Sequence, residues 1–96
     1  MTNERKSKLR RNADQGDAEA QYTLGELYYS GENVPQDFMM ARGWYEKAAV
    51  QGHAAAQTGL GTLYFSGRGV SQDYAEAAKW FHLAAVQGHA VAQRKK

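Results

Sequence analysis

The sequence contains no cysteine, and its 96 residues include no apolar run near the roughly 20 residues that a membrane-spanning helix requires. Without cysteine the chain has no disulfide framework, no thiolate nucleophile and no cysteine-based zinc site, which fits a reducing compartment. The residues after Met1 are charged and lack the apolar core of a signal peptide. We therefore expect a cytoplasmic protein that does not enter a membrane.

Basic residues are scarce in the body of the chain. Residues 12–93 hold four Lys/Arg against nine Asp/Glu, whereas residues 1–11 hold five Lys/Arg against one glutamate and residues 94–96 are all basic. The sequence thus lacks the continuous basic stripe that nucleic-acid binding favours. We interpret the basic ends as solvated termini and expect no nucleic-acid partner.

The sequence also lacks a recognisable catalytic or cofactor-binding motif. His53 and His89 are 36 residues apart and His82 is separate from both, so we interpret all three as surface residues rather than as ligands converging on zinc. The segment 67–69, Gly-Arg-Gly, has no lysine of a phosphate-binding loop and is interpreted as a turn. We expect no enzymatic activity, no metal and no cofactor.

The strongest positive feature is an internal repeat of 36 residues. Segments 16–51 and 52–87 align without a gap and are identical at 19 positions, and a third copy begins at Gly88. Self-similarity at this period is typical of solenoids, in which each unit buries its apolar face only against its neighbours. The repeat predicts an all-α superhelix and, as its function, a surface that binds a partner.

Each copy is predicted to form two antiparallel helices, because its apolar residues recur at helical spacing and no stretch alternates like a strand. Gly25 and Gly61 occupy equivalent positions in the first helices, although glycine costs a helix interior about 1 kcal/mol. Their presence suggests that a neighbouring helix passes too close for a methyl group. The first helices are expected to end at the Ser-Gly pairs 30–31 and 66–67.

The loops and second helices follow the same logic in both copies. Val34 and Val70 are expected to fill the gap between the two helices of each repeat, and Asp37 and Asp73 to cap the second helix. The second helices carry aromatic residues and alanines on one stripe, which we interpret as core. This stripe consists of Phe38, Ala41, Trp44, Tyr45, Ala48 and Ala49 in the first copy and of Tyr74, Ala77, Trp80, Phe81, Ala84 and Ala85 in the second.

The two copies share a characteristic set of residues. In the first copy the set comprises residues 20–28, Gly31, Val34, Asp37, Ala41, Trp44, Tyr45, Lys47, Ala48 and Ala49. In the second copy it comprises Leu60, Gly61, Tyr64, residues 67–70, Asp73, Ala77, Trp80, Phe81, Ala84 and Ala85. Over residues 16–93 this pattern resembles the Sel-one-like repeat (SLR) family. The resemblance implies a right-handed superhelix of antiparallel helix pairs, related to tetratricopeptide repeats, that acts as an adaptor or scaffold for protein partners.

Three residues depart from the family pattern. Asn33 replaces the second loop glycine of the first copy, Gly43 interrupts its second helix, and Leu83 replaces the lysine seen at Lys47. These departures leave the predicted fold unchanged and affect the surface.

We interpret residues 1–96 as a single solenoid domain with the two repeats at its centre. Two repeats are few for a stable stack, so the ends are expected to contribute. Residues 3–15 are predicted to form an N-terminal capping helix, and residues 88–96 a partial third repeat that covers the last one as a short final helix.

The positions at which the two first helices differ lie on one helical face. We predict that this face lines a concave groove for a protein or peptide partner, and that its glutamates favour a segment bearing Lys or Arg. The alternative is a solvated face without a function. The predicted groove residues are Glu19, Tyr22, Thr23, Glu26, Tyr29, Ala55, Thr58, Thr62 and Phe65.

A second hypothesis is a structural homo-oligomer, such as a homodimer, that assembles through exposed repeat ends. Met39, Met40 and Leu83 are the predicted self-association residues. The methionines have two interpretations, since they would serve either as a plastic contact surface or as fillers of irregular gaps in the core.

Overall fold

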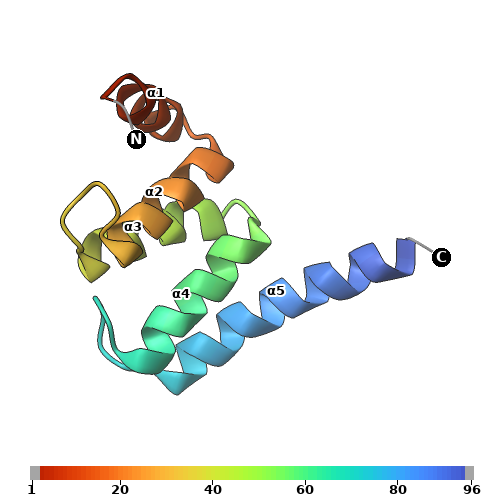
Figure 1. Ribbon diagram of the computed structural model, residues 1–96. Coiled ribbons are helices and arrows are strands. Elements are labelled where there is room, and N and C mark those ends of the chain that lie inside the picture. The colour runs from red at the N-terminus through yellow and green to blue at the C-terminus, as the bar shows by residue number, and fades with distance from the viewer. Residues whose placement is uncertain (1–2, 95–96) are drawn as a thin grey trace.

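The computed structural model describes the backbone of residues 3–94 and the side chains of residues 4–88. All regular structure in this range is helical, which confirms the all-α prediction (Figure 1). No described helix has both the length and the apolar character needed to cross a bilayer. The helices are α1 (Asn3–Asp14), α2 (Ala18–Ser30), α3 (Phe38–Ala49), α4 (Ala54–Ser66) and α5 (Tyr74–Arg94).

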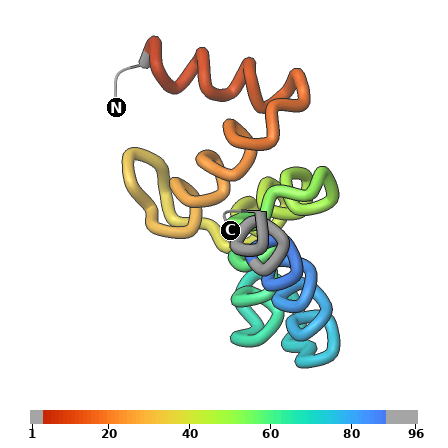
Figure 2. Tube along the Cα trace, turned by 90° about the vertical axis from the view of Figure 1, so that its right-hand side faces the viewer, coloured from red at the N-terminus to blue at the C-terminus, as the bar shows by residue number. Residues whose placement is uncertain are grey.

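Each helix packs against the next one along the chain, so the described residues form an open stack rather than a closed bundle (Figures 1 and 2). Helices α2 and α3 form the first antiparallel pair, and α4 and α5 form the second. Helix α1 lies at one end of the stack, against α2, and α5 lies at the other. This arrangement is the α-helical solenoid that the repeat predicted.

The second helices begin at the predicted aspartate caps. A carboxylate oxygen of Asp37 accepts a hydrogen bond from the backbone N–H of Met40 at 3.1 Å, and Asp73 accepts one from Glu76 at 3.0 Å. These bonds satisfy amide groups that have no partner within the helix. The same loops hold Val34 and Val70, which pack against the core as predicted.

The core lies along α3, whose aromatic and alanine stripe contacts helices on both sides. Tyr45 is 1% exposed and packs in the larger cluster of buried side chains, together with Leu60, Leu63 and Trp80. Trp44 packs in a second cluster at the α1 end of the stack. The core prediction is therefore confirmed at Trp44, Tyr45 and Trp80, but it is wrong at Tyr74 and Phe81, which are 61% and 36% exposed, and at Ala85, because these side chains lie on α5 at the end of the stack.

The ring of Tyr45 is held between two glycines from different helices. A Cβ atom at Gly25 of α2 would lie 2.5 Å from one edge of the ring, and a Cβ atom at Gly59 of α4 would lie 3.0 Å from the other edge. At Gly61 a Cβ atom would lie 2.7 Å from the ring of Phe81. The close approach predicted at Gly25 and Gly61 is confirmed, and aromatic rings are its cause.

One buried glutamine in each repeat, Gln21 or Gln57, joins the helix pair of that repeat to the helix before it. The side-chain amide of Gln21 donates to the carbonyl oxygen of Ala13 at 3.1 Å, and that of Gln57 donates to Ala49 at 3.1 Å. Their amide oxygens accept hydrogen bonds from Gln51 at 2.8 Å and from Gln87 at 2.9 Å. The same relay thus recurs at equivalent positions of the two repeats.

The C-terminal segment differs from its prediction. Gly52 has a φ of 94° and forms the turn between α3 and α4, but its equivalent Gly88 lies inside α5, which continues to Arg94. The prediction of a separate short final helix after the second repeat is wrong for the described backbone, because α5 includes these residues. The side-chain packing expected of residues 89–96 lies outside the described residues.

Asn33 and Gly43, two of the residues that depart from the family pattern, leave the fold unchanged. Asn33 adopts a left-handed φ of 66°, and α3 continues through Gly43.

Candidate functional site

The predicted groove residues occupy α2 and α4, and the two helices contribute differently. On α2, Glu19 and Glu26 are exposed, whereas Tyr22, Thr23 and Tyr29 are half-buried. The α4 residues Ala55, Thr58, Thr62 and Phe65 are all exposed. The structure therefore brings the α2 residues into contact with the neighbouring helices and leaves the α4 residues open to solvent.

Tyr22 lies at the centre of the part of the predicted groove that α2 contributes. Its ring stacks on the ring of His53 with centroids 4.8 Å apart and on Tyr45 with centroids 5.9 Å apart. Glu19 and Glu26 lie about one turn before and after Tyr22 on the same face of α2. We refer to Glu19, Tyr22, Glu26, Tyr45 and His53 as the acidic-aromatic cluster.

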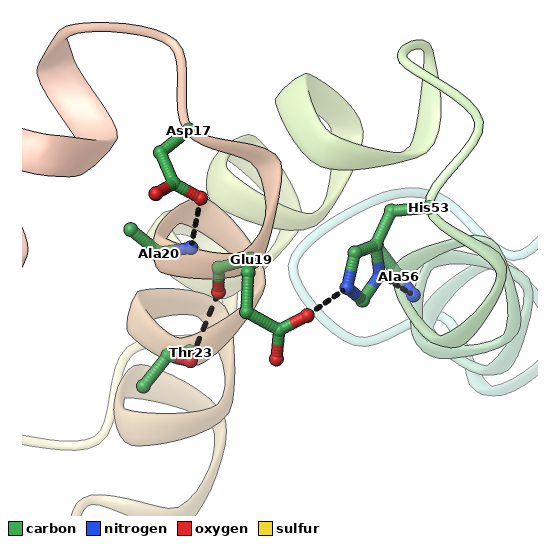
Figure 3. A network of polar contacts seen from close by, with 6 residues as sticks. All are labelled: Asp17, Glu19, Ala20, Thr23, His53 and Ala56. Carbon is green, nitrogen blue, oxygen red and sulfur yellow. Dashed lines mark hydrogen bonds and ion pairs between the residues drawn. The ribbon is translucent and has the colours of Figure 1, made fainter.

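His53 links the start of α4 to Glu19 (Figure 3). Its Nδ1 accepts a hydrogen bond from the backbone N–H of Ala56 at 3.1 Å, and its Nε2 lies 2.7 Å from a carboxylate oxygen of Glu19. Because Nδ1 is an acceptor, this arrangement assigns the ring proton to Nε2, which donates to Glu19. His53 is therefore the N-cap of α4, and it also holds the carboxylate of Glu19 by a hydrogen bond.

The interpretation of His53 as a surface residue is wrong, since its side chain is only 16% exposed. The sequence held one signal for its role. His53 is the counterpart of Asp17, which caps α2 by accepting from the backbone N–H of Ala20 at 3.1 Å (Figure 3). His82 is exposed as predicted, and the side chain of His89 lies outside the described residues.

The second glutamate of the cluster is held by the core. The hydroxyl of Tyr45 donates to a carboxylate oxygen of Glu26. Burial and the hydrogen bond to Glu26 raise the pKa of Tyr45 well above its usual value. Burial, followed by the negative charges of Glu26 and Glu19, raises the pKa of Tyr22. The two carboxylates therefore act together on one phenol and create a negative potential around it.

Tyr29, one turn beyond Glu26, contacts both α3 and the second repeat. Its ring lies edge-on to Phe38 with centroids 5.5 Å apart, and its hydroxyl accepts a hydrogen bond from Arg68 at 3.4 Å. The guanidinium of Arg68 also lies 5.2 Å from the centre of the Phe38 ring. The segment 67–69 is thus a turn, as predicted, and it packs Arg68 against the first repeat.

The threonines of the predicted groove bond to their own helices. Thr23 donates to the carbonyl oxygen of Glu19 at 2.9 Å, Thr58 to Ala54 at 3.3 Å and Thr62 to Thr58 at 3.0 Å. No described side chain from another helix is hydrogen-bonded to these hydroxyls. They shape the surface of the groove, whereas the fixed polar groups lie in the acidic-aromatic cluster.

The predicted self-association residues lie outside this groove. Met39 and Met40 are 67% and 37% exposed on α3, so they do not fill gaps in the core. Leu83 is exposed on α5. Among the described residues, no group of three or more His, Cys, Asp or Glu side chains is arranged to hold a metal ion.

Comparison with known proteins gives one family. The family model of the Sel1 repeat matches residues 18–53 and 54–89. No curated protein is significantly similar to the chain.

Solved structures of three bacterial proteins are similar. The first is a protective antigen present in uropathogenic Escherichia coli strains that displays an SLR fold, with 52% identity, a TM-score of 0.82, and coverage of 83% of this chain and 17% of that one. The second is a Sel1 repeat protein from Oxalobacter formigenes, with 44% identity, a TM-score of 0.76, and coverage of 84% and 33%. The third is the Helicobacter pylori cysteine rich protein B, with 26% identity, a TM-score of 0.83, and coverage of 91% and 67%. The chain therefore spans only a part of the first two proteins.

Proposed function

The chain belongs to the Sel1 repeat family, and from this premise we propose that it is a non-enzymatic interaction module whose acidic-aromatic cluster binds a basic segment of a protein partner. Sel1 repeat proteins are generally non-catalytic helical scaffolds that mediate protein interactions. The observation that carries the proposal is the pair of glutamates held on either side of Tyr22 by His53 and Tyr45.

The two carboxylates are positioned before a ligand arrives. Glu19 and Glu26 are seven residues apart on α2, or roughly 10 Å along the helix axis at 1.5 Å per residue. A carboxylate has two oxygens and about four acceptor positions, so each can keep its bond to His53 or Tyr45 and still accept from a guanidinium or an ammonium group. Little side-chain entropy is lost on binding when the acceptors are already fixed.

The electrostatics favour a cation at the same place. Burial raises the pKa of Tyr22 most, and the charges of Glu26 and Glu19 raise it further, which means that these carboxylates make the potential at its hydroxyl negative. A Lys or Arg side chain would relieve this potential, and its apolar stem would lie against the ring of Tyr22. The acidic body of the chain supports the same choice of partner, because long-range attraction accelerates the encounter of opposite charges.

The test uses a fluorescein-labelled peptide in which arginines alternate with serines, titrated by fluorescence anisotropy. We expect the double variant Glu19→Gln/Glu26→Gln to bind it at least about tenfold more weakly, a loss of about 1.4 kcal/mol. The matched control, Glu32→Gln/Glu46→Gln, removes the same two charges outside the cluster and should bind like the wild type. Equal weakening of both variants would show nonspecific charge attraction and would contradict the proposal.

A second candidate function, assembly of identical copies, is favoured by one observation. Phe65, Tyr74 and Phe81 are exposed at the end of the stack, although their counterparts in the first repeat are covered by the second repeat. Under this candidate, light scattering over a concentration series would give a molar mass that rises to that of a dimer. A single-chain mass at every concentration would eliminate it and would leave the basic-segment proposal unaffected.

A further inference from the structure

We propose that a depression between α1 and α3 is a second binding site, which accepts one large apolar side chain of an acidic peptide segment. The depression has a volume of about 290 Å³. Helix α1 contributes Arg10 and Asp14 to its wall, and α3 contributes Met39, Met40, Gly43, Trp44 and Lys47. It shares no residue with the acidic-aromatic cluster.

Gly43 is the residue that the fold does not explain. It lies inside the continuous helix α3, where glycine costs about 1 kcal/mol relative to alanine. Its φ is not positive, and a Cβ atom built on it would meet nothing within 4 Å. Neither a turn nor a close helix contact requires glycine here. Its consequence is an open space next to Trp44.

The second repeat carries a long side chain at the same position. The counterpart of Gly43 is Lys79, whose ammonium group lies 5.0 Å from the centre of the Trp80 ring. The other two differences on this stripe are Met39 against Ala75 and Lys47 against Leu83. Residues 39, 43 and 47 are spaced by four and therefore lie on one face of α3. The two repeats thus differ along a whole stripe, and in the first repeat this stripe lines the depression.

The apolar part of the site suits a flexible contact. Met39 and Met40 are exposed, and unbranched thioether side chains adjust to the shape of an inserted group. The depression is slightly smaller than the about 300 Å³ at which pockets for whole small molecules begin. A single leucine or phenylalanine side chain of a peptide fits this volume better than a cofactor does.

The charged part of the site selects an acidic segment. Arg10 and Lys47 lie 5.3 Å and 5.5 Å from the centre of the Trp44 ring, one from each helix. Asp14, the one carboxylate in the wall, is hydrogen-bonded to Arg10 at 3.1 Å. Lys47 therefore gives the wall a net positive charge. Glutamates that flank the inserted side chain would pair with Lys47 and with the remaining N–H groups of Arg10.

The test uses a capped, fluorescein-labelled peptide with one leucine flanked on both sides by glutamates, measured by fluorescence anisotropy with the whole chain. We expect binding that weakens at least about tenfold when the glutamates are replaced by glutamines, which equals the loss of one good charge pair. We also expect Gly43→Lys to weaken binding at least about tenfold, because the lysine stem would occupy the open space next to Trp44.

Gly43→Lys separates the proposal from its alternatives. The substitution improves helix propensity, so a thermal melt should show equal or higher stability, and lost binding cannot result from unfolding. It also adds a positive charge, so simple charge attraction would strengthen binding. Stronger or unchanged binding by this variant would overturn the proposal.

Two further comparisons complete the test. Lys47→Leu, which installs the residue of the second repeat, should weaken binding, whereas Lys79→Leu removes the same charge from α5 and should not. Absence of peptide binding by the wild type would overturn the proposal. Loss of peptide binding at high protein concentration, where copies of the chain would cover the depression by self-association, would overturn it as well. Glu19→Gln/Glu26→Gln should leave this site unchanged, so the failure of one site is distinguishable from the failure of the other.

Discussion

Gly25→Ala is expected to lower the free energy of unfolding by about 2 kcal/mol, although alanine favours a helix interior over glycine by about 1 kcal/mol. The new methyl group would lie 2.5 Å from the ring of Tyr45, well inside van der Waals contact. The ring cannot move away, because the backbone of Gly59 lies against its opposite edge and its hydroxyl is bonded to Glu26. Either α2 must shift from α3 or the buried ring must leave its position.

The matched control is Gly61→Ala, the same substitution at the equivalent position of the second repeat. Its methyl group would lie 2.7 Å from the ring of Phe81, but this side chain is 36% exposed and has room to rotate toward solvent. We expect little change or a small gain in stability. Urea unfolding of the two variants measures the difference. Equal losses of unfolding free energy in the two variants would show that confinement of the Tyr45 ring between two helices does not set the cost of the substitution.

This pair of glycines shows how far the sequence alone can lead. Their recurrence 36 residues apart predicted a close helix contact at both positions, and the structure confirms it. The sequence could not distinguish them, because the confinement of Tyr45 depends on Gly59 of the next repeat, a position where the first repeat has Thr23. The cost of a substitution is therefore set by tertiary contacts that the repeat pattern does not contain.

The candidate site was predictable in the same limited sense. Comparison of the two repeats predicted that Glu19, Tyr22 and Glu26 share a face, which follows from helical spacing alone. It did not predict that His53 and Tyr45 hold the two carboxylates, because these contacts join residues 34 and 19 positions apart. Tyr45 was assigned to the core and His53 to the surface, yet each has an additional role at the boundary between the two.

The C-terminal segment shows a different limit. Gly88 repeats Gly52, and the sequence therefore predicted a partial third repeat as a separate short helix, but glycine permits a turn without imposing one. At Gly52 the turn is stabilised by α4, since Gln57 bonds to the carbonyl oxygen of Ala49 and the backbone N–H of His53 bonds to that of Ala48 at 3.2 Å. Each residue added to an existing helix gains one backbone hydrogen bond, and α5 continues through Gly88.

The buried glutamine relay gives the second large expected effect. Gln57→Leu should lower the free energy of unfolding by about 2–3 kcal/mol, even though leucine is apolar and of similar size. The substitution removes two hydrogen bonds at the contact between the repeats: the carbonyl oxygen of Ala49 loses the buried amide donor at 3.1 Å and keeps only the backbone N–H of Gly52 at 3.0 Å, and the half-buried amide of Gln87 loses its acceptor at 2.9 Å. Gln57 is 4% exposed, so water cannot replace these bonds without opening the contact between the repeats.

The appropriate control is another glutamine that makes the same kind of bond in solvent. Gln72 donates its side-chain amide to the carbonyl oxygen of Phe65 at 2.8 Å and is exposed, so water can take its place. Gln72→Leu should change the free energy of unfolding by about 0.5 kcal/mol or less in urea titrations. A similar small loss for Gln57→Leu would contradict a structural role for the relay. A large loss confined to Gln57 would indicate that the repeats are joined by specific polar contacts as well as by apolar packing, because the relay recurs at Gln21 where α1 meets the first repeat.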